Sequence, residues 1–403
     1  MNFWGVTGTN GKTTTTWIAA EFINADPSHK CGYVTTVEVN TGTRRFYTGY
    51  TTPPLVQLKE IFAEMEANGC TDCVMEVSSH AIHQHRTGDT VFSGGVFTNL
   101  SEDHLDYHKT MAAYFDVKLD FARQIAAAHP TTPDMGRRDL PPYIVCLDGV
   151  YGREMFNAVG NLSVNVIGVS AKKVEGKGGG GRRNFDLSEL KLAGDYNKSN
   201  VLCAAALAEA AGVSHDAIQA VIPTLKPRWG RLEEVKSEKV KCRVFVDFAH
   251  TPDGLEKVLT AVRGEMHSKP LKLLKPLKPS LWIVFGAGGD RDPMKRPLMG
   301  AACAKLADRL VVTSDNPRSE DPVKIIEAIR EGVRSVDRSA FGLSPSDFLF
   351  VEPDRAKAIA LALSSAGEGD VVVIAGKGHE TTQEIAGVKY PFDDREVVRR
   401  FLR

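Results

Sequence analysis

The chain has 403 residues, of which 42% are hydrophobic and 25% are charged, as is usual for soluble globular proteins. Lysine and arginine together number 50, and so do aspartate and glutamate, so the formal net charge is zero. This composition excludes a disordered chain, a collagen-like fibre and a disulfide scaffold. The balanced charge argues against a general binder of nucleic acid or of membrane surfaces. Chains longer than roughly 250 residues usually form more than one hydrophobic core.

The seven cysteines are few for this length, and Cys70 and Cys73 form a CxxC without a second pair. A structural zinc site usually needs four such ligands, so we interpret the cysteines as buried, reduced thiols. The N-terminus has no signal-peptide pattern, and no apolar run reaches the roughly 18 residues of a membrane span. These features predict a cytoplasmic protein, and we expect a monomer.

Strand-like apolar runs alternate with helix-like segments, which predicts an α/β architecture with largely parallel sheets. The first half contains predicted strands at 3–7, 73–77, 91–98 and 143–147, and predicted helices at 12–25, 112–128 and 200–211. The second half contains predicted strands at 243–247, 281–285, 309–313 and 370–375, and predicted helices at 294–307, 323–333 and 355–365. Glycine and proline predict loops at 176–183 and 269–279. We place a domain boundary near 226–229, which predicts domains at 1–226 and 227–403.

A glycine-rich loop lies between the first predicted strand and the first predicted helix, and it consists of Gly8, Thr9, Asn10, Gly11, Lys12, Thr13 and Thr14. Glycines let backbone N–H groups turn toward phosphate oxygens, and a helix N-terminus adds partial positive charge. Lys12 can reach the outer phosphates, and the Thr13 hydroxyl can bind Mg²⁺. The longer GxxxxGK[ST] spacing is not met, because Val6 stands where it needs glycine. The alternative is a chance glycine turn, but strand, loop and helix together predict a nucleoside triphosphate site.

Two polar segments follow the next predicted strands. Glu76 begins the segment EVSSHA, and His104 lies within TNLSEDHLDYHKTM. A carboxylate and a neutral imidazole at neighbouring strand ends suit Mg²⁺ held against phosphates. The alternative is that the histidine is a hydrogen-bonded structural residue.

These segments resemble the Mur ligases. The resemblance runs from residue 4 to the C-terminus and includes GTNGKTT, EVSSHA, TNLSEDHLDYHKTM, AYFDVK, LAGDYNKSN, DFAHTPD, FGAGGDRD, KRPLMG, DNPR and GKGHE. It implies a phosphate-loop ATPase central domain with a parallel sheet, followed by a Rossmann-like α/β domain that binds an amino acid.

The resemblance also implies an ATP- and Mg²⁺-dependent ligase that forms an amide bond through an acyl phosphate. The implied catalytic residues are Lys12, Glu76, His104 and Lys118, and the implied Mg²⁺ ligands are Thr13, Glu76, His104 and Lys118. Lys118 matches a lysine that the family carries as a carbamate, an anion that can help to hold Mg²⁺. The alternative for Lys118 is a solvated lysine on a helix surface.

Further site residues follow from the resemblance alone. The implied ATP contacts are the glycine-rich loop together with Asn197, Asn200, Arg231, Asp247 and His250. The implied contacts to the peptide substrate are Thr51, Thr52, Ser78, Gln84 and Arg86. Thr51 and Thr52 precede two prolines and alone would indicate a turn. Arg86 could instead form a surface ion pair that contributes little.

The segment DNPR bears on which amino acid is added. In the family, its arginine distinguishes ligases that add meso-diaminopimelate from those that add lysine, which lacks the second carboxylate. Arg318 offers a planar fork to such a carboxylate, Arg291 is a second cation, and Glu380 can receive the ammonium. The implied amino-acid contacts are therefore Arg291, Asp315, Asn316, Pro317, Arg318, Gly376 and Glu380. Helix capping could explain Asp321 or Ser319, but it does not account for Arg318.

The implied reaction joins meso-diaminopimelate to UDP-N-acetylmuramoyl-L-Ala-D-Glu, as in the synthesis of peptidoglycan precursors. Three departures from the family stand out. The domain that binds UDP has no counterpart before the glycine-rich loop, so the chain is a truncated form, is completed by another chain, or acts without UDP. Arg228-Trp229-Gly230-Arg231 replaces Pro-Gly-Arg, and Lys109 replaces a frequent glycine. Two alternatives remain: a folylpolyglutamate-synthase-like ligase, against which DNPR and GKGHE argue, and an inactive nucleotide-binding scaffold.

Overall fold

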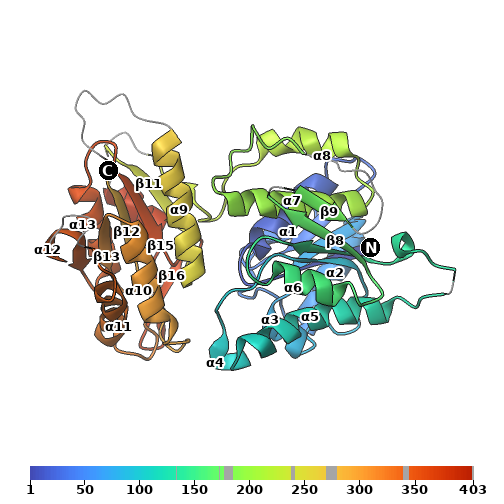
Figure 1. The fold of residues 1–403 in the computed structure, drawn as a ribbon, viewed down its shortest axis with the longest axis horizontal. Helices are drawn as coiled ribbons and strands as arrows, with labels where there is room; N and C mark the ends of the chain where they lie inside the picture. Colours follow the sequence, from blue (N-terminus) through green and yellow to red (C-terminus); the bar gives the residue numbers. More distant parts are fainter. Residues whose placement is uncertain are drawn as a thin grey trace. The chain divides into compact units, whose positions relative to one another are not determined.

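The computed structural model describes residues 1–132, 134–171, 173–176, 185–236, 241–268, 279–338 and 345–401. The loops predicted at 176–183 and 269–279 lie outside these residues except at one end. The chain forms two compact units (Figure 1), one of residues 1–101 and 108–225 and one of residues 102–107 and 226–403. The short segment 102–107 therefore groups with the second unit, although it follows a strand of the first.

The described part of the first unit forms a nine-stranded sheet in the order β4-β3-β2-β5-β1-β6-β7-β8-β9. Its strands are β1 (Asn2–Thr7), β2 (Cys31–Val34), β3 (Val39–Asn40), β4 (Arg45–Phe46), β5 (Asp72–Glu76), β6 (Phe92–Phe97), β7 (Pro142–Cys146), β8 (Asn165–Ser170) and β9 (Lys173–Gly176). The six strands from β2 to β8 in the middle of this order pair in parallel, and only β3, β4 and β9 are antiparallel additions. The carboxyl ends of the parallel strands therefore meet at one edge.

Helices cover both faces of this sheet (Figure 1). The α-helices are α1 (Lys12–Ile23), α2 (Leu55–Ala67), α3 (Ser79–His83), α4 (Leu105–His108), α5 (Met111–Ala128), α6 (Gly152–Val159), α7 (Asp195–Ala210) and α8 (His215–Val221). Two 3₁₀ turns span Arg137–Asp139 and Ile222–Thr224. Helices α1 and α7 pack against each other, whereas α2, α5 and α6 contribute apolar side chains to a shared core with the sheet.

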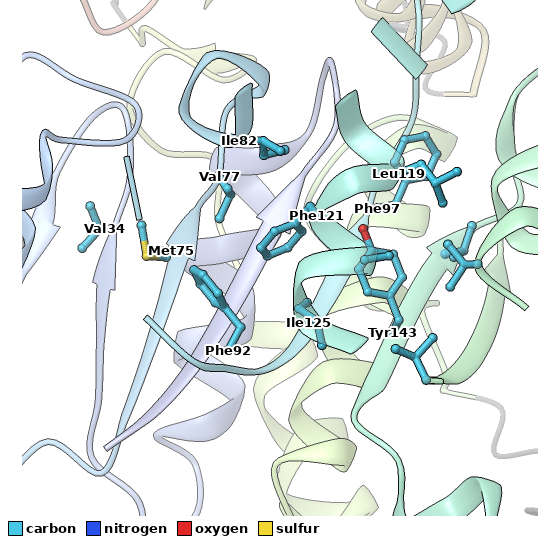
Figure 2. Packing of buried hydrophobic residues seen from close by; sticks show 14 of the residues in the cluster. Val34, Met75, Val77, Ile82, Phe92, Phe97, Leu119, Phe121, Ile125 and Tyr143 are labelled. Carbon is cyan, nitrogen blue, oxygen red and sulfur yellow. The ribbon is translucent and has the colours of Figure 1, made fainter. Parts of the chain in front are cut away.

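Phe121 of α5 lies at the centre of that core (Figure 2). Its ring packs edge-on against Phe92, with centroids 5.1 Å apart, and lies 6.2 Å from the ring of Tyr143. A Cβ atom on Gly5 of β1 would lie 2.2 Å from Cζ of Phe121, so only glycine leaves room for the ring. Because Phe121 fixes α5 against β1, it also fixes Lys118, one turn earlier on the same helix.

The described part of the second unit forms a six-stranded sheet in the order β10-β11-β15-β12-β13-β14 and a separate hairpin of β16 and β17. The strands are β10 (Glu233–Glu234), β11 (Arg243–Asp247), β12 (Leu281–Phe285), β13 (Arg309–Val312), β14 (Leu349–Val351), β15 (Val371–Ala375), β16 (Thr382–Ile385) and β17 (Val388–Pro391). All pairs in the larger sheet are parallel except β10 with β11.

The helices of the second unit are α9 (Pro252–Ser268), α10 (Lys295–Leu306), α11 (Pro322–Arg334), α12 (Pro345–Phe348), α13 (Arg355–Ser365) and α14 (Asp394–Phe401). A fully buried ion pair joins α13 to α14, in which Nε and Nη2 of Arg355 each lie 2.8 Å from an oxygen of Asp394. Arg355 also donates to the carbonyls of Ser314 and Ala375. Ala375 is the last residue of β15, and Ser314 lies two residues after the end of β13. One guanidinium therefore joins the loops that follow these two strands.

The predicted α/β class with largely parallel sheets is confirmed. The strands predicted at 243–247 and 281–285 and the helix at 355–365 have the observed bounds. The helix predicted from residue 200 begins at Asp195, because Gly194 takes a positive φ of 89° and turns the chain into the helix earlier. The β16–β17 hairpin was not predicted. Among the described residues no helix is both long and apolar enough to cross a membrane, and all seven cysteines are free and buried.

A buried carboxylate, Asp72, lies at the start of β5. It accepts hydrogen bonds from Trp4 Nε1 at 3.0 Å, Asn2 Nδ2 at 3.2 Å and Thr71 Oγ1 at 2.7 Å, and Nδ1 of His29 lies 2.7 Å away. Burial by itself would raise the pKa of Asp72, but these hydrogen bonds outweigh it and lower the pKa below its usual value. The ionised form therefore stabilises the fold.

We predict that Asp72→Asn lowers the free energy of unfolding at pH 7 by about 3 kcal/mol, because buried donors lose a charged acceptor. Since the folded pKa is depressed, this stabilisation is present above the unfolded pKa near 4 and is lost as pH falls through the folded pKa. Urea unfolding at several pH values measures it, with the exposed Asp89→Asn as control. A variant that loses the same stability at pH 3 as at pH 7 would contradict the prediction.

Candidate active site

The glycine-rich loop connects the end of β1 to the start of α1. Gly8 and Gly11 take φ values of 147° and 83°, which favour glycine. The end of β6 holds the loop from one side, because Asn10 N donates to Asn99 Oδ1 at 3.0 Å and Thr98 Oγ1 donates to the Asn10 carbonyl at 2.7 Å. The result is a rigid turn that leads into the N-terminus of a twelve-residue helix, the geometry that binds phosphate.

Lys12 lies back over this loop. Its Nζ donates to the carbonyls of Gly8 at 3.0 Å and Thr9 at 2.8 Å. The cation therefore lies beside the loop itself, which is where an outer phosphate would meet it.

Glu76 ends β5 beside β1, and its side chain is almost fully buried. Oε1 accepts from Thr13 Oγ1 at 2.8 Å and from Thr36 N at 2.7 Å, and Oε2 accepts from Thr36 Oγ1 at 3.1 Å. Thr36 thus orients the carboxylate with both its backbone and its side chain. The Thr13 hydroxyl and the Glu76 carboxylate present oxygen ligands at one point, as Mg²⁺ prefers.

These residues fit a magnesium ion carried by a nucleotide. Among the described residues no group of three or more His, Cys, Asp and Glu side chains could hold a metal ion. Protein sites for Mg²⁺ of this kind supply only one or two oxygen ligands, and phosphate oxygens and water supply the rest. The pair formed by Thr13 and Glu76 matches that donor set.

Lys118 is 1% exposed, which excludes the alternative of a solvated helix lysine. Its Nζ lies 3.4 Å from Thr7 Oγ1 and 4.9 Å from the ring centroid of Tyr114. Thr7 is the last residue of β1, so Lys118 lies directly next to the start of the glycine-rich loop. Its predicted carbamylation stays a prediction.

Asn200 on α7 lies under the glycine-rich loop. A Cβ atom on Gly11 would lie 2.4 Å from Asn200 Oδ1, and Thr15 Oγ1 donates to the same oxygen at 3.3 Å. Asn200 Nδ2 donates to Asn197 Oδ1 at 3.3 Å. The two predicted ATP contacts on α7 are therefore neighbours of the phosphate loop.

The predicted contacts to the peptide substrate lie together in the first unit. Thr52 Oγ1 donates to the carbonyl of Glu76 at 2.9 Å and accepts from Ser78 N at 3.0 Å. Arg86 Nε donates to Gln84 Oε1 at 2.8 Å, and its Nη1 lies 3.5 Å from the Thr52 carbonyl. Arg86 forms no ion pair among the described residues, so the alternative of a surface ion pair does not apply.

Thr51 connects this group to Glu76, because Thr51 Oγ1 lies 3.0 Å from Thr36 Oγ1, which itself donates to the Glu76 carboxylate. One threonine that the sequence analysis did not single out therefore contacts both predicted subsites. The signal for it was weak, because Thr36 follows the four-residue strand β2, which was not predicted.

His104 belongs to the segment that groups with the second unit, and it lies in the left-handed region with φ 55°. Its backbone N donates to Asp103 Oδ1 at 3.0 Å, and its Nε2 lies 3.5 Å from Asp103 Oδ2. Lys109 has a φ of 67°, which favours glycine. Glycine would adopt that conformation without strain, so the departure places a lysine where the backbone favours glycine.

Asp247 ends β11 and holds two loops of the second unit. Its Oδ2 accepts from Leu232 N at 2.6 Å, and its Oδ1 accepts from Ala249 N at 2.7 Å. Burial raises the pKa of Asp247 above its usual value. The guanidinium of Arg231 stacks over Phe248, 4.6 Å from the ring centroid, and His250 Nδ1 lies 2.8 Å from the Phe248 carbonyl. The predicted residues Arg231, Asp247 and His250 are therefore brought together.

The departure at Arg228-Trp229-Gly230-Arg231 forms a tight turn, in which Arg231 N donates to the Arg228 carbonyl. Trp229 and Gly230 have φ values of 53° and 61°. A Cβ atom on Gly230 would lie 2.2 Å from the carbonyl carbon of Gly378. His379 packs on Phe248 at 4.9 Å, and burial, with the charges of Arg231 and Arg395, lowers the pKa of His379 to about 3.

Asp315 and Asn316 follow β13, and Gly376 and Glu380 follow β15, which is separated from β13 by β12. Asn316 Nδ2 donates to Glu380 Oε2 at 2.9 Å. A Cβ atom on Gly376, whose φ is 115°, would lie 3.0 Å from Asp315 Oδ2. Four of the residues predicted to bind the amino acid therefore lie in one cluster, together with Lys377.

Arg318 is held in a defined position at the edge of that cluster. Its φ is 51°, and its N–H donates to the Glu384 carbonyl while its own carbonyl accepts from Ala386 N. Its Nη1 donates to the Gly289 carbonyl at 2.6 Å, and its Nε lies 3.7 Å from Glu384 Oε2. The β16–β17 hairpin thus orients the guanidinium.

Arg291 and Pro317 complete the predicted set. Arg291 is exposed and donates to the carbonyl of Asp290 at 2.9 Å. Among the described residues of the second unit, none fixes its guanidinium as firmly as that of Arg318 is fixed. The Pro317 carbonyl faces Gly289, since a Cβ atom there would lie 2.0 Å from its oxygen.

Parallel strands with a phosphate loop at one sheet edge define an α/β nucleotide-binding protein. Residues 6–208 match the Mur ligase middle domain, and residues 230–378 match the Mur ligase glutamate ligase domain. The chain belongs to the Mur ligase family.

Its relatives include two proteins named UDP-N-acetylmuramoyl-L-alanyl-D-glutamate–2,6-diaminopimelate ligase. The one from Aquifex aeolicus (strain VF5) is 38% identical over 415 residues, covering 100% of this chain and 77% of the relative. The one from Geobacillus kaustophilus (strain HTA426) is 38% identical over 413 residues, covering 99% of this chain and 78% of the relative.

Solved structures are similar as well. A structure of a ligase with the same name is 30% identical, has a TM-score of 0.58 and covers 100% of this chain and 78% of its own. A folylpolyglutamate synthase from Mycobacterium tuberculosis has a TM-score of 0.63 and covers 100% and 91%, but it is only 18% identical. That second likeness is one of fold alone.

We predict that Gly289→Ala displaces the loop that carries Arg318. A Cβ atom would overlap the Pro317 carbonyl at 2.0 Å, and backbone cannot give way as a side-chain tip can. The expected cost is about 1–3 kcal/mol of stability, with a shift of the Arg318 guanidinium in a crystal structure. Gly264→Ala on α9, where a Cβ meets nothing within 4 Å, is the matched control. An unmoved Arg318 in a fully stable variant would refute the prediction.

Proposed function

We propose that this protein joins meso-diaminopimelate to UDP-N-acetylmuramoyl-L-Ala-D-Glu at the expense of ATP. The observation that carries the proposal is the geometry around Arg318. The Arg318 guanidinium is anchored by the Gly289 carbonyl and by the β16–β17 hairpin. Arg318 lies in the same loop as Asn316, which donates a hydrogen bond to Glu380. A fixed cation and a nearby carboxylate suit the distal carboxylate and ammonium of a diamino diacid.

The first step needs negative charge to be balanced on a transferring phosphoryl group. The substrate carboxylate attacks the γ-phosphorus of ATP, which forms an acyl phosphate and releases ADP. Lys12 and the N-terminus of α1 stabilise the phosphate charge, and Thr13 with Glu76 would hold Mg²⁺, which supplies further charge neutralisation when bound. Thr52, Ser78 and Arg86 orient the peptide substrate.

In the second step, the amine of the incoming amino acid attacks the acyl carbon and expels phosphate. Arg318 selects the amino acid with a distal carboxylate, because lysine offers nothing to its planar fork. The names of the relatives support this choice, since both contain diaminopimelate.

We further propose that the protein acts in the cytoplasm, as a monomer, on small molecules rather than on nucleic acid or membranes. A folylpolyglutamate-synthase activity is less well supported, because that likeness is limited to the fold.

Lys118 is proposed to act as a carbamate whose negative charge helps to hold Mg²⁺. We predict that Lys118→Ala lowers kcat by about a hundredfold or more, and that added short carboxylates partly restore it by supplying the lost anion. Intact-mass measurement after fixation of carbamates is a second readout. Lys357→Ala, which removes an exposed lysine, is the control. Full activity in Lys118→Ala, or an unmodified Lys118 in a well-ordered active enzyme, would remove the carbamate from the mechanism.

Arg318→Ala tests the proposed function most directly. We predict that kcat/KM for meso-diaminopimelate falls roughly thirty- to a thousandfold, because a charge-assisted bidentate contact is worth about 2–4 kcal/mol at a desolvated site. Lysine, which lacks the distal carboxylate, should be affected far less, and the KM for ATP should not change. The assay is amide formation on UDP-N-acetylmuramoyl-L-Ala-D-Glu.

Arg334→Ala on α11, whose side chain is half exposed, is the matched control and should behave as wild type. Equal losses for lysine and meso-diaminopimelate would make Arg318 structural. If the wild-type protein prefers lysine, the proposed amino acid is wrong, but the proposed ligase activity still stands. If wild type joins neither amino acid at any concentration, the proposed function is wrong and an inactive nucleotide-binding scaffold is the better description.

A further inference from the structure

Lys377 is the lysine of GKGHE, and the proposed mechanism gives it no role. Its side chain is 0% exposed. It lies between Gly376 and Gly378, whose φ values of 115° and 51° produce a tight turn after β15. Its Nζ lies 2.8 Å from Glu380 Oε2, 3.1 Å from Asn316 Oδ1 and 3.7 Å from Asp315 Oδ1.

The charges around Lys377 do not cancel. One ammonium faces two carboxylates, Asp315 and Glu380, so the cluster keeps one net negative charge. The nearby Arg355 does not alter this balance, because it is already paired with Asp394. Asp315 Oδ1 is buried and accepts no hydrogen bond from any described residue. Since buried charge is costly unless it is compensated, this cluster is suited to a cationic ligand.

The two oxygens of Glu380 have different surroundings. Oε2 receives hydrogen bonds from Lys377 Nζ at 2.8 Å and Asn316 Nδ2 at 2.9 Å. Oε1 accepts none from the described part of the chain, and the side chain is 32% exposed. Oε2 is therefore held by buried donors, whereas Oε1 is left to hydrogen-bond with a solute.

We propose that Lys377 is a positioning residue that sets Glu380 and Asn316 to receive an ammonium group of the incoming diamino acid. Because its Nζ is withdrawn from solvent, Lys377 does not touch the amino acid but acts through Glu380. Lys377 also positions Asn316, because Asn316 Oδ1 accepts hydrogen bonds from both Lys377 Nζ and Glu384 N. This inference deepens the proposed function and rests on it for the identity of the amino acid.

Lys377→Met keeps the length of the side chain and removes its charge. The KM for meso-diaminopimelate should rise about tenfold or more, because Glu380 loses a charged hydrogen-bond donor, whereas the KM for ATP should not change. Glu380→Gln should raise the same KM. The double variant should be no worse than Glu380→Gln alone, because Lys377 acts through Glu380. Additive effects of the two substitutions, or an unchanged KM in Lys377→Met, would overturn the proposal.

Arg263→Met is the matched control, because it breaks an ion pair with Asp308 in the same unit, away from this cluster. It should lower the melting temperature without changing the KM for meso-diaminopimelate. If Lys377→Met does not fold, the double variant Lys377→Met with Asp315→Asn is the second test. It returns the net charge of the cluster to the wild-type value, and its KM for meso-diaminopimelate should still be raised. A wild-type KM in that folded variant would overturn the proposal.

A crystal structure separates this inference from the proposed function. If wild type joins no amino acid, the proposed function fails, but the Lys377→Met structure still tests the positioning role. Glu380 should leave the Asn316 amide in that structure. If Glu380 stays bonded to Asn316 as in wild type, Lys377 does not position it, whatever the activity.

Discussion

Parallel pairing of β1 with both β5 and β6 is the constraint on which the first unit depends. Parallel strands bring their carboxyl ends to one edge, so three separate stretches of chain meet there. β1 supplies the glycine-rich loop, β5 supplies Glu76, and β6 supplies the Thr98 and Asn99 contacts that hold the loop. Gly5 belongs to the same constraint, because its missing side chain admits Phe121 and so places α5 and Lys118 beside β1.

In the second unit, the main constraint is that several buried charged side chains are held in fixed positions within a small cluster. Arg355 and Asp394 compensate each other, and through the carbonyls of Ser314 and Ala375 they join the loop after β13 to the end of β15. A buried ion pair of this kind is weak evidence for stability. Its two extra bonds to carbonyls give it a clearer role, which is to hold the loops that carry Asn316 and Glu380 at a constant separation.

The proposed specificity depends on local features rather than on the fold. A folylpolyglutamate synthase that is 18% identical has a similar fold, so the fold does not identify the amino acid. The features that we propose to select the amino acid are local. They are a left-handed Arg318, the glycines at 288 and 289 that leave room for its side chain and for the Pro317 carbonyl, and a hairpin that hydrogen-bonds to its backbone. Function follows from such sites rather than from the fold that carries them.

The sequence alone determined the α/β class, the phosphate loop and the resemblance to a family, because these depend on local spacing and on alternation of apolar runs. The bounds of β11, β12 and α13 followed from the same local patterns. Tertiary structure alone decided that Lys118 is buried, that Thr36 holds Glu76, and that the β16–β17 hairpin orients Arg318. Each of these depends on contacts between residues that are distant in sequence or on burial. No local pattern encodes them, since a lysine on a helix looks the same in sequence whether water or the end of a neighbouring strand lies beside it.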